Sequence, residues 1–396
     1  MTTDPTPRVP DAAEQPLRIG VVCYPTYGGS GVVATELGLG LARRGHHVHF
    51  VSYRQPARYK GYEANVYFHE VGGGVDYPLF EYPPYDTALA SKLVEVARRE
   101  RLDLIHVHYA IPHATVAFLA REILAARGER VPFVTTLHGT DITLVGQSPA
   151  FRPVVEFGIN ASDGVTAVSA SLRRDTLASF DIRVPVEVVP NFIDLARFRP
   201  VDKRHFKLAI APGGEPILAH VSNFRPVKRV EDVVRVFCRV RAALPSKLLL
   251  IGDGPERYRA EELVRECSLQ DDVRFLGKQD AVEELLAICD LFLMPSASES
   301  FGLAALEAMA CRVPVVSSDA GGLSEVNLHG ETGYLSEVGD VEAMAANALK
   351  ILRDPDVLAT FRERAYAQAQ RFDLEVVLPH YEAVYRQVLA GVPAAA

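Results

Sequence analysis

The sequence is poor in the features that mark several large classes of protein. Its five cysteines lie far apart and none forms a CxxC pair, which argues against a network of disulfides and against a structural zinc site. No apolar run reaches the ~18 residues of a membrane-spanning helix. Residues 1–15 lack the apolar centre of a signal peptide. We therefore expect a disordered tail over residues 1–15, no contact with membranes, and a protein of the cytoplasm.

Long runs of basic residues are also missing. The chain has 42 Lys and Arg residues against 50 Asp and Glu residues, for a formal net charge of −8. An acidic chain without a basic run is a poor candidate for non-specific binding to nucleic acid, although a local basic pocket for a phosphate stays open. With 396 residues, the chain is long enough for two or three domains.

Short apolar runs alternate with longer helical patterns along most of the chain. Runs that are apolar throughout are typical of buried parallel strands. Strands are predicted at residues 18–23, 47–53, 104–107, 133–137, 164–168, 186–189, 217–221, 247–251, 273–276, 291–294 and 313–317. Repeated βα units predict an α/β protein with open parallel sheets and helices on both faces of each sheet.

Prolines and glycines interrupt this alternation near the middle of the chain, where Pro200, Pro212, Gly213 and Gly214 lie close together. Such a stretch is typical of a linker between domains. We therefore predict two Rossmann-like domains, at residues 16–195 and 215–372, joined by a linker at 196–214. The last segment, 373–396, is predicted as a helix that could pack back on the N-terminal domain.

A cluster of glycines directly follows the first predicted strand. Gly28, Gly29 and Gly31 flank Ser30, at the strand end where ligands bind in such sheets. Glycine lets the backbone approach a ligand, and the next helix offers its N–H groups. A tight turn without a ligand is the alternative. The motif is neither GxGxxG nor a phosphate-binding loop followed by Lys and Ser or Thr.

Histidines mark the ends of two other predicted strands. His138 follows Thr136 beside a glycine, so a functional role is favoured over a purely structural one. His106 and His108 alternate onto one face of their strand, which raises the question of a metal. No carboxylate with recognised ligand spacing lies nearby, so we predict no metal site.

The second half of the chain holds a basic loop and a second glycine motif. Arg225, Lys228 and Arg229 lie between a predicted strand and a helix, an arrangement that favours an anion site over a solvated loop. Gly252 and Pro255 end the next strand, where a turn alone would also explain them.

Two glutamates stand eight positions apart at the strongest motif. Glu299 lies in a loop, and Glu307 follows in a largely apolar helical segment. A carboxylate among Ala, Leu and Met is costly to bury unless it has a partner, and sugar or ribose hydroxyls would supply one. The N–H groups of Phe301, Gly302 and Leu303 are available at the helix start for a diphosphate.

With this spacing the chain resembles the retaining glycosyltransferases of the GT-B fold, whose hallmark is Glu, seven residues, Glu. The resemblance runs from residue 18 to about residue 385. Residues 23–33, 106–114, 136–143 and 222–230 are similar to the branch that makes N-acetylglucosaminyl malate for bacillithiol. It implies two facing Rossmann-like domains, with the acceptor on the N-terminal one, the nucleotide sugar on the C-terminal one, and an active-site cleft between them.

The resemblance also implies substrates and roles. The donor would be UDP-N-acetylglucosamine, the acceptor L-malate, and no metal or other cofactor would be needed. Glu307 would bind the ribose and Glu299 a hydroxyl of the transferred sugar, while Lys228 would neutralise the diphosphate. His138 would contact the sugar near the reacting carbon, so that His138, Lys228 and Glu299 form the catalytic group.

The remaining contacts follow from the same comparison. Further donor contacts are expected from Gly28, Gly29, Asn223, Arg225, Gly252, Ser300, Phe301, Gly302 and Leu303. Acceptor contacts are expected from Ser30, Tyr109 and Thr136. The chain could also form a homo-oligomer.

Two departures from the family pattern stand out. Asn223 replaces a family arginine, which leaves open whether Arg225 or Arg229 supplies the second charge. Arg312 replaces a family glycine, and we expect it to hold an ordinary backbone angle with only a local effect. Three rival functions remain: a related transferase with another acceptor such as an inositol phosphate, a UDP-N-acetylglucosamine 2-epimerase, and a non-catalytic sensor of nucleotide sugars.

Overall fold

Each half of the chain forms one parallel sheet, as the apolar runs predict. The computed structural model describes residues 15–72 and 85–391. Its contacts divide the chain into two units: Met1–Ala167, Arg173–Val189 and Leu378–Ala396 belong to the first, and Val168–Leu172 and Pro190–Val377 to the second. Within the described ranges, no helix is long and apolar enough to cross a membrane. The predicted tail, residues 1–15, lies outside the described residues apart from Gln15.

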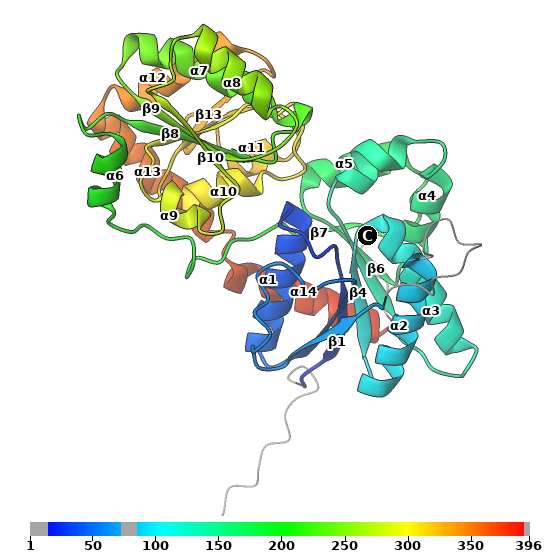
Figure 1. Cartoon of the computed structure of the whole chain (residues 1–396). Coiled ribbons are helices and arrows are strands. Elements are labelled where there is room, and N and C mark those ends of the chain that lie inside the picture. Colours follow the sequence, from blue (N-terminus) through cyan, green and yellow to red (C-terminus); the bar gives the residue numbers. More distant parts are fainter. Residues whose placement is uncertain (1–14, 73–84, 392–396) are drawn as a thin grey trace, which may run out of the picture. The chain divides into compact units, whose positions relative to one another are not determined.

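The first unit contains a seven-stranded parallel sheet in the order β3-β2-β1-β4-β5-β6-β7 (Figure 1). Its strands are β1 (Arg18–Val22), β2 (His47–Ser52), β3 (Val66–Glu70), β4 (Leu104–His108), β5 (Phe133–Leu137), β6 (Gly164–Ala167) and β7 (Glu187–Val188). Its helices are α1 (Gly29–Arg43), α2 (Tyr85–Glu100), α3 (Thr115–Ala125), α4 (Arg152–Asn160), α5 (Ala170–Ser179) and most of α14 (Leu374–Leu389), with short turns η1 (Ala110–Ala114), η2 (Thr140–Leu144) and η3 (Val145–Gln147).

The last helix of the chain packs in the first unit. Tyr381 and Tyr385 of α14 are fully buried, and the Tyr385 hydroxyl is hydrogen-bonded to Nδ1 of His106 on β4 at 2.8 Å. Val384 and Val388 lie directly against Gly164 of β6, where a larger side chain would not fit. The segment that ends the chain therefore completes the core formed by its first strands.

The second unit contains a six-stranded parallel sheet in the order β10-β9-β8-β11-β12-β13. Its strands are β8 (Ile217–Ser222), β9 (Lys247–Gly252), β10 (Val273–Gly277), β11 (Leu291–Met294), β12 (Val315–Ser318) and β13 (Gly333–Ser336). Its helices are α6 (Arg204–Ile210), α7 (Val230–Ala243), α8 (Arg257–Glu266), α9 (Val282–Leu286), α10 (Leu303–Ala310), α11 (Leu323–Val326), α12 (Val341–Leu352) and α13 (Pro355–Gln370), with a short turn η4 (Pro226–Lys228). The prediction of two parallel, Rossmann-like α/β sheets is confirmed.

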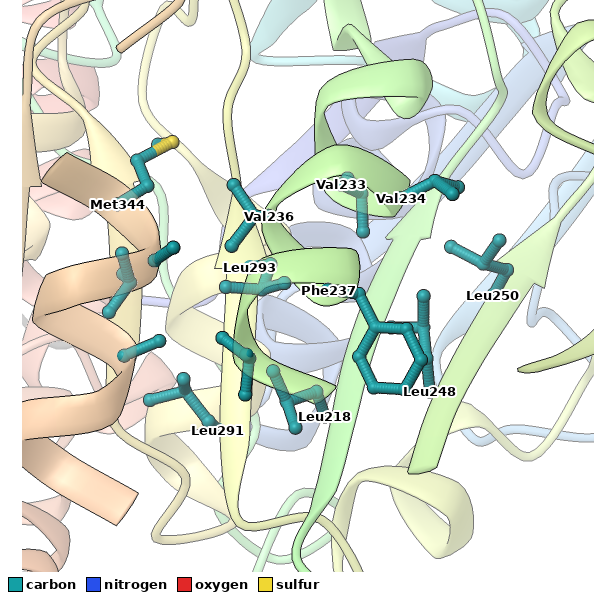
Figure 2. Packing of buried hydrophobic residues seen from close by; sticks show 14 of the residues in the cluster. Leu218, Val233, Val234, Val236, Phe237, Leu248, Leu250, Leu291, Leu293 and Met344 are labelled. Carbon is teal, nitrogen blue, oxygen red and sulfur yellow. The ribbon is translucent and has the colours of Figure 1, made fainter. Parts of the chain in front are cut away.

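Helix α7 shows how the second sheet buries its face. Val233, Val236 and Phe237 recur at helical spacing and pack on Leu218 of β8 and Leu248 of β9 (Figure 2). This is the apolar stripe of an amphipathic helix. Fully burying each of these side chains contributes about 1.5–3 kcal/mol, so the stripe fixes α7, and with it the basic loop that precedes the helix.

Strand order places the predicted motifs together within each unit. In the first sheet β1 lies between β2 and β4, and in the second β8 lies between β9 and β11. Chain connections leave in opposite directions at such points, which opens a crevice at the carboxyl ends of the two central strands. The glycine cluster and Tyr109 follow β1 and β4, whereas Lys228 and Glu299 follow β8 and β11.

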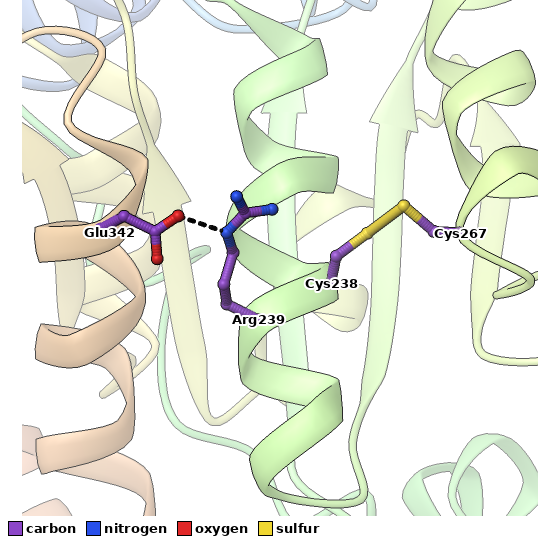
Figure 3. Close-up of a disulfide and its surroundings, with 4 residues drawn as sticks. All are labelled: Cys238, Arg239, Cys267 and Glu342. Atoms are coloured by element: carbon purple, nitrogen blue, oxygen red, sulfur yellow. Dashed lines mark hydrogen bonds and ion pairs between the residues drawn. A yellow bond between two sulfur atoms is a disulfide. The ribbon is translucent and has the colours of Figure 1, made fainter.

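A disulfide joins two helices of the second unit. Cys238 of α7 and Cys267 at the end of α8 are bonded and lie 29 positions apart (Figure 3). The sequence argument against disulfides thus misses this single bridge, because cysteines 29 positions apart give no local signal. Cys23, Cys289 and Cys311 are free and buried.

Reducing this bridge should destabilise the second unit. Closing a loop of 29 residues stabilises a fold by about 3.6 kcal/mol through the entropy of the unfolded chain. We expect dithiothreitol to lower the midpoint of urea unfolding of the wild type. The Cys238→Ala/Cys267→Ala variant should start at the lower midpoint and show no response to dithiothreitol. A wild-type midpoint that is the same with and without reductant would contradict the bridge.

Candidate active site

An ion pair joins the basic loop to the first glutamate of the motif. Nζ of Lys228 donates to Oε1 of Glu299 at 2.5 Å. Lys228 ends η4 after β8, and Glu299 follows β11, the strand that pairs with β8. The two side chains are only 22% and 10% exposed. The fold thus brings together two residues that the sequence predicts for the diphosphate and the transferred sugar.

The second glutamate lies on the buried side of α10. Glu307 is 9% exposed and is surrounded in sequence by buried Ala, Leu and Met residues. The helix begins directly after Gly302, whose φ of 101° lies in the left-handed region that favours glycine. Phe301 is buried and its ring packs on Phe372 at 5.5 Å, so only the backbone of Phe301 can serve a ligand.

Residues that the sequence reasoning did not single out support the Glu299 loop. Gly322 donates its N–H to the carbonyl of Glu299 at 2.8 Å, and a Cβ at either Gly321 or Gly322 would clash with the loop's carbonyl oxygens. Ser169 Oγ donates to the carbonyl of Ser300 at 2.6 Å. The sequence signal that could have indicated this support is the pair of adjacent glycines, Gly321 and Gly322, just after β12 at the crevice end of the sheet.

Gly322 is not itself a predicted ligand contact, but Gly322→Ala should disturb the loop that carries Glu299 and Ser300. The added methyl group would meet the carbonyl of Ser300, so the loop must shift. A misplacement of about 1 Å can cost about 100-fold in rate, and we expect kcat/KM of the transferase reaction to fall by about that factor. Gly72→Ala is the control, because a Cβ there meets nothing within 4 Å and the backbone angle is one that alanine adopts without strain. Equal rates for the two variants would contradict the support role.

The basic loop offers one exposed arginine and one engaged arginine. Arg229 lies in the left-handed region at φ 49°, and its guanidinium contacts the buried carboxylate of Asp232, with Nε 2.6 Å from Oδ2. Arg225 and Asn223 are exposed. Within the part of the chain that the structure describes, Arg225 forms no ion pair. Of the two arginines, Arg225 is therefore the one whose charge is available at the loop.

The second glycine motif packs against this loop. Gly252 has φ 122°, and a Cβ there would clash with the carbonyl of Ser222. Gly254 approaches the carbonyl of Asn223 in the same way. The glycines therefore serve the close packing of two loops, and Gly252 fixes the backbone beside Asn223.

The expectation for Arg312 was wrong. Its φ is 61°, in the left-handed region, so arginine adopts here the angle that a glycine would take without cost. Its side chain compensates by contacts within the unit: Nη1 lies 3.1 Å from Oε1 of Glu363, and the guanidinium lies 5.2 Å from the ring centre of Tyr366.

In the first unit, the glycine cluster opens α1. Gly28 is its N-cap, and no side chain caps the helix. Gly28 and Gly29 are exposed, whereas Gly31 is the glycine that sterics demand, because a Cβ there would lie 2.5 Å from the carbonyl of Tyr24. The Tyr109 hydroxyl donates to Oγ of Ser30 at 2.7 Å. Two of the predicted acceptor contacts therefore lie side by side.

His138 lies against the same tyrosine. Its ring centre is 5.3 Å from that of Tyr109, and the histidine is 8% exposed. Burial lowers the pKa of His138 to about 3, and the nearby His113 adds to this effect. The imidazole is therefore neutral at pH 7.

Asp141 is a second buried titratable group in this part of the unit. Burial raises the pKa of Asp141 to about 6, although its carboxylate accepts backbone N–H bonds from Ala110 and Gly139.

Thr136 has a structural environment. It is fully buried, and its hydroxyl is hydrogen-bonded to Nε2 of His106 and to Oγ1 of Thr166, both at 2.7 Å. Because the Thr136 hydroxyl is buried and hydrogen-bonded within the protein, we expect the acceptor substrate to contact Ser30 and Tyr109 instead. Both ring nitrogens of His106 are likewise hydrogen-bonded within the protein. Across residues 15–72 and 85–391, no group of three or more His, Cys, Asp or Glu side chains is placed to hold a metal ion.

Known proteins match the chain along most of its length. Residues 27–197 match the model of Glycosyltransferase Family 4, and residues 201–368 match that of Glycosyl transferases group 1. N-acetyl-alpha-D-glucosaminyl L-malate synthase of Bacillus anthracis is 48% identical over 375 residues, which cover 94% of this chain and 97% of that protein.

Two further matches are more distant. D-inositol 3-phosphate glycosyltransferase of Nocardia farcinica is 33% identical over 72% of this chain and 68% of its own length. Sucrose-phosphate synthase of Thermosynechococcus elongatus has a similar structure, with a TM-score of 0.79 over 94% of this chain and 99% of that one, at 23% identity. The chain therefore belongs to the GT-B glycosyltransferases that join a family 4 N-terminal part to a group 1 C-terminal part.

Proposed function

We propose that this glycosyltransferase moves N-acetylglucosamine from UDP-N-acetylglucosamine to the hydroxyl of L-malate, the first step of bacillithiol synthesis in the cytoplasm. The name of the relative at 48% identity supports this acceptor. The observation that carries the proposal is the contact of Lys228 with Glu299, since it sets a cation and a sugar-binding carboxylate side by side after neighbouring strands.

The donor would be held by the second unit. Glu307, a carboxylate on the buried side of α10, would accept hydrogen bonds from the ribose hydroxyls. The N–H groups at the start of α10 and the backbone beside Gly252 would contact the diphosphate. Glu299 would use the carboxylate oxygen that Lys228 leaves open for a hydroxyl of the transferred sugar.

The negative charge of the leaving group would be stabilised by cationic side chains. As the bond between the sugar and the diphosphate breaks, negative charge builds on the β-phosphate. Lys228 is held at this place by its ion pair, and Arg225 is exposed and available as the second cation. Together with the dipole of α10, they would do what a divalent cation does in other transferases.

The acceptor would bind at the first unit. Ser30 and Tyr109 form a hydroxyl pair at the start of α1, next to the exposed backbone of Gly28 and Gly29. N–H groups at a helix start favour anions, so those of Gly28 and Gly29 would contact the donor diphosphate, while Ser30 and Tyr109 would contact L-malate. His138 lies beside Tyr109 and would contact the sugar near the reacting carbon.

We further propose that the anomeric configuration is retained. The malate hydroxyl would attack the anomeric carbon from the face that the diphosphate leaves, a new C–O bond would form as the old one breaks, and the leaving phosphate oxygen would take the hydroxyl proton. Glu299 already accepts a hydrogen bond from Lys228, so it is a poor candidate for a covalent nucleophile. No such intermediate is needed on this route.

The test is release of UDP from UDP-N-acetylglucosamine with and without L-malate, in the presence of EDTA, with the configuration of the product determined by NMR. Release that depends on malate, persists in EDTA and yields an α-linked product is the expected result. Release with an inositol phosphate but not with malate would move the acceptor to that of the Nocardia relative.

Two other outcomes would also overturn the proposal. Conversion of the donor without any acceptor would indicate an epimerase. Binding of the donor without any turnover would indicate a sensor.

A further inference from the structure

Two buried histidines of the first unit are hydrogen-bonded to each other. His108 ends β4 and His138 follows β5, and the two strands are paired so that His108 lies opposite Thr136. Nδ1 of His108 and Nε2 of His138 are 2.8 Å apart. His108 is fully buried, so this contact is shielded from water.

Both rings are neutral, which leaves one hydrogen for the contact. Burial, with the neighbouring histidines adding to it, lowers the pKa of His108 well below its ordinary value and that of His138 to about 3. A neutral imidazole carries its single hydrogen on one of its two nitrogens. Either His108 donates from Nδ1 to His138, or His138 donates from Nε2 to His108.

The other nitrogen of His108 decides between these arrangements. Nε2 of His108 is buried and has no hydrogen-bond partner among the residues that the structure describes. If His138 were the donor, the hydrogen of His108 would lie on Nε2 as a buried N–H without an acceptor. Buried N–H groups of that kind are rarer than buried acceptors without a donor, and each costs about 1–3 kcal/mol.

The neighbouring His113 has the same tautomer for an independent reason. Its Nδ1 lies 2.5 Å from the carbonyl oxygen of His108. A carbonyl can only accept, so His113 must donate from Nδ1 and leave its own buried Nε2 without a hydrogen. The backbone carbonyl of His108 therefore holds His113 in its Nδ1–H tautomer.

We propose that His108 is a positioning residue that holds His138 in its Nδ1–H tautomer. Because Nε2 of His138 accepts from His108, its single hydrogen lies on Nδ1. With its hydrogen on Nδ1, His138 is a hydrogen-bond donor at that nitrogen and cannot act as a base through it. This inference deepens the proposed function and rests on it only for the role of His138 in turnover.

The tautomer can be measured without substrate. The full chain is labelled with ¹⁵N-histidine, and the state of each ring nitrogen is read from two-bond ¹H–¹⁵N correlations, with His138→Gln assigning the His138 signals. We expect His138 to carry its hydrogen on Nδ1 and not to titrate between pH 6 and 8. A hydrogen on Nε2, or titration in that range, would overturn the proposal whether or not malate is the acceptor.

Kinetics of two variants test the consequence. The Nδ2–H₂ group of asparagine can take the place of the His108 Nδ1–H donor, whereas leucine removes the donor. We expect His108→Leu to lower kcat by about 100-fold, in the range that positioning of catalytic groups affects, and His108→Asn to stay within a few-fold of the wild type. UDP affinity should be unchanged in both, because His108 is buried beside His138 and is not among the residues proposed to contact the donor.

Each result of the kinetic test has a clear meaning. Wild-type kcat in His108→Leu would overturn the proposal, and so would equal losses in the two variants. If His108→Leu fails to bind UDP, its fold is disturbed, and the decision rests on the asparagine variant together with the tautomer of His138. Complete failure of turnover with malate in the wild type would contradict the proposed acceptor but leave the tautomer measurement in force.

Discussion

Lys228→Met should lower kcat by about 10²–10³-fold, the usual loss when one group that stabilises developing charge is removed. Lys228 lies 2.5 Å from Glu299 and is only 22% exposed, so its charge is held in one place. In the variant, the Glu299 carboxylate keeps its charge beside the position proposed for the diphosphate. Two negative groups would then repel each other where a cation stood. The initial rate of UDP release at saturating donor and acceptor measures the effect.

Lys247→Met is the matched control for this loss. Lys247 forms an ion pair with Asp272 at 2.6 Å and is 19% exposed, so it resembles Lys228 in its partner and its burial. It stands at the amino end of β9, the opposite end from the crevice. We expect kcat to stay within a few-fold of the wild type. Comparable losses in the two variants would mean that ion pairs of this unit act through stability, and that Lys228 has no special role at the phosphate.

The sequence predicts which segments meet, because parallel strands carry their following loops to one edge of the sheet. The loops with Lys228 and with Glu299 are separated by 71 positions, yet both follow strands that the apolar runs identify. What the pattern cannot give is the partner of each side chain. Alternation along β4 places His106 and His108 on one face, but their actual partners, Tyr385 and His138, come from α14 and the end of β5.

Support of a loop by remote backbone is harder still to predict. Ser169 and Gly322 fix the Glu299 loop through its carbonyl oxygens. Every residue has a backbone carbonyl, so the sequence does not indicate which ones accept such bonds. The left-handed backbone angle of Arg312 is also hard to predict. The family glycine indicates a positive φ, but an arginine at the same position suggests an ordinary angle, and the backbone nevertheless keeps the positive φ. Thr136 is expected to contact the acceptor from the family resemblance alone, which gives no sign that its hydroxyl is hydrogen-bonded to His106 and Thr166 in the core.

Glu307→Ala should weaken binding of UDP by about 100-fold. The proposal gives this carboxylate two ribose hydroxyls, and hydrogen bonds to a charged group contribute about 1.5 kcal/mol or more each. The residue is 9% exposed on α10, so solvent competes little for its oxygens. Calorimetry with UDP measures the affinity. Glu342→Ala serves as the control, because Glu342 is 72% exposed and pairs with Arg239 on the surface (Figure 3), and its removal should leave UDP affinity unchanged.

A second ligand separates ribose recognition from damage to the fold. The wild type should bind 2′,3′-dideoxy-UDP about as weakly as Glu307→Ala binds UDP, and the variant should no longer distinguish the two ligands. If the variant still prefers UDP by the full wild-type factor, the ribose is held elsewhere and the role assigned to Glu307 is wrong. Because the ribose hydroxyls do not change during transfer, this contact stabilises ground state and transition state equally. The loss in Glu307→Ala should therefore appear in KM for the donor, whereas the loss in Lys228→Met should appear in kcat.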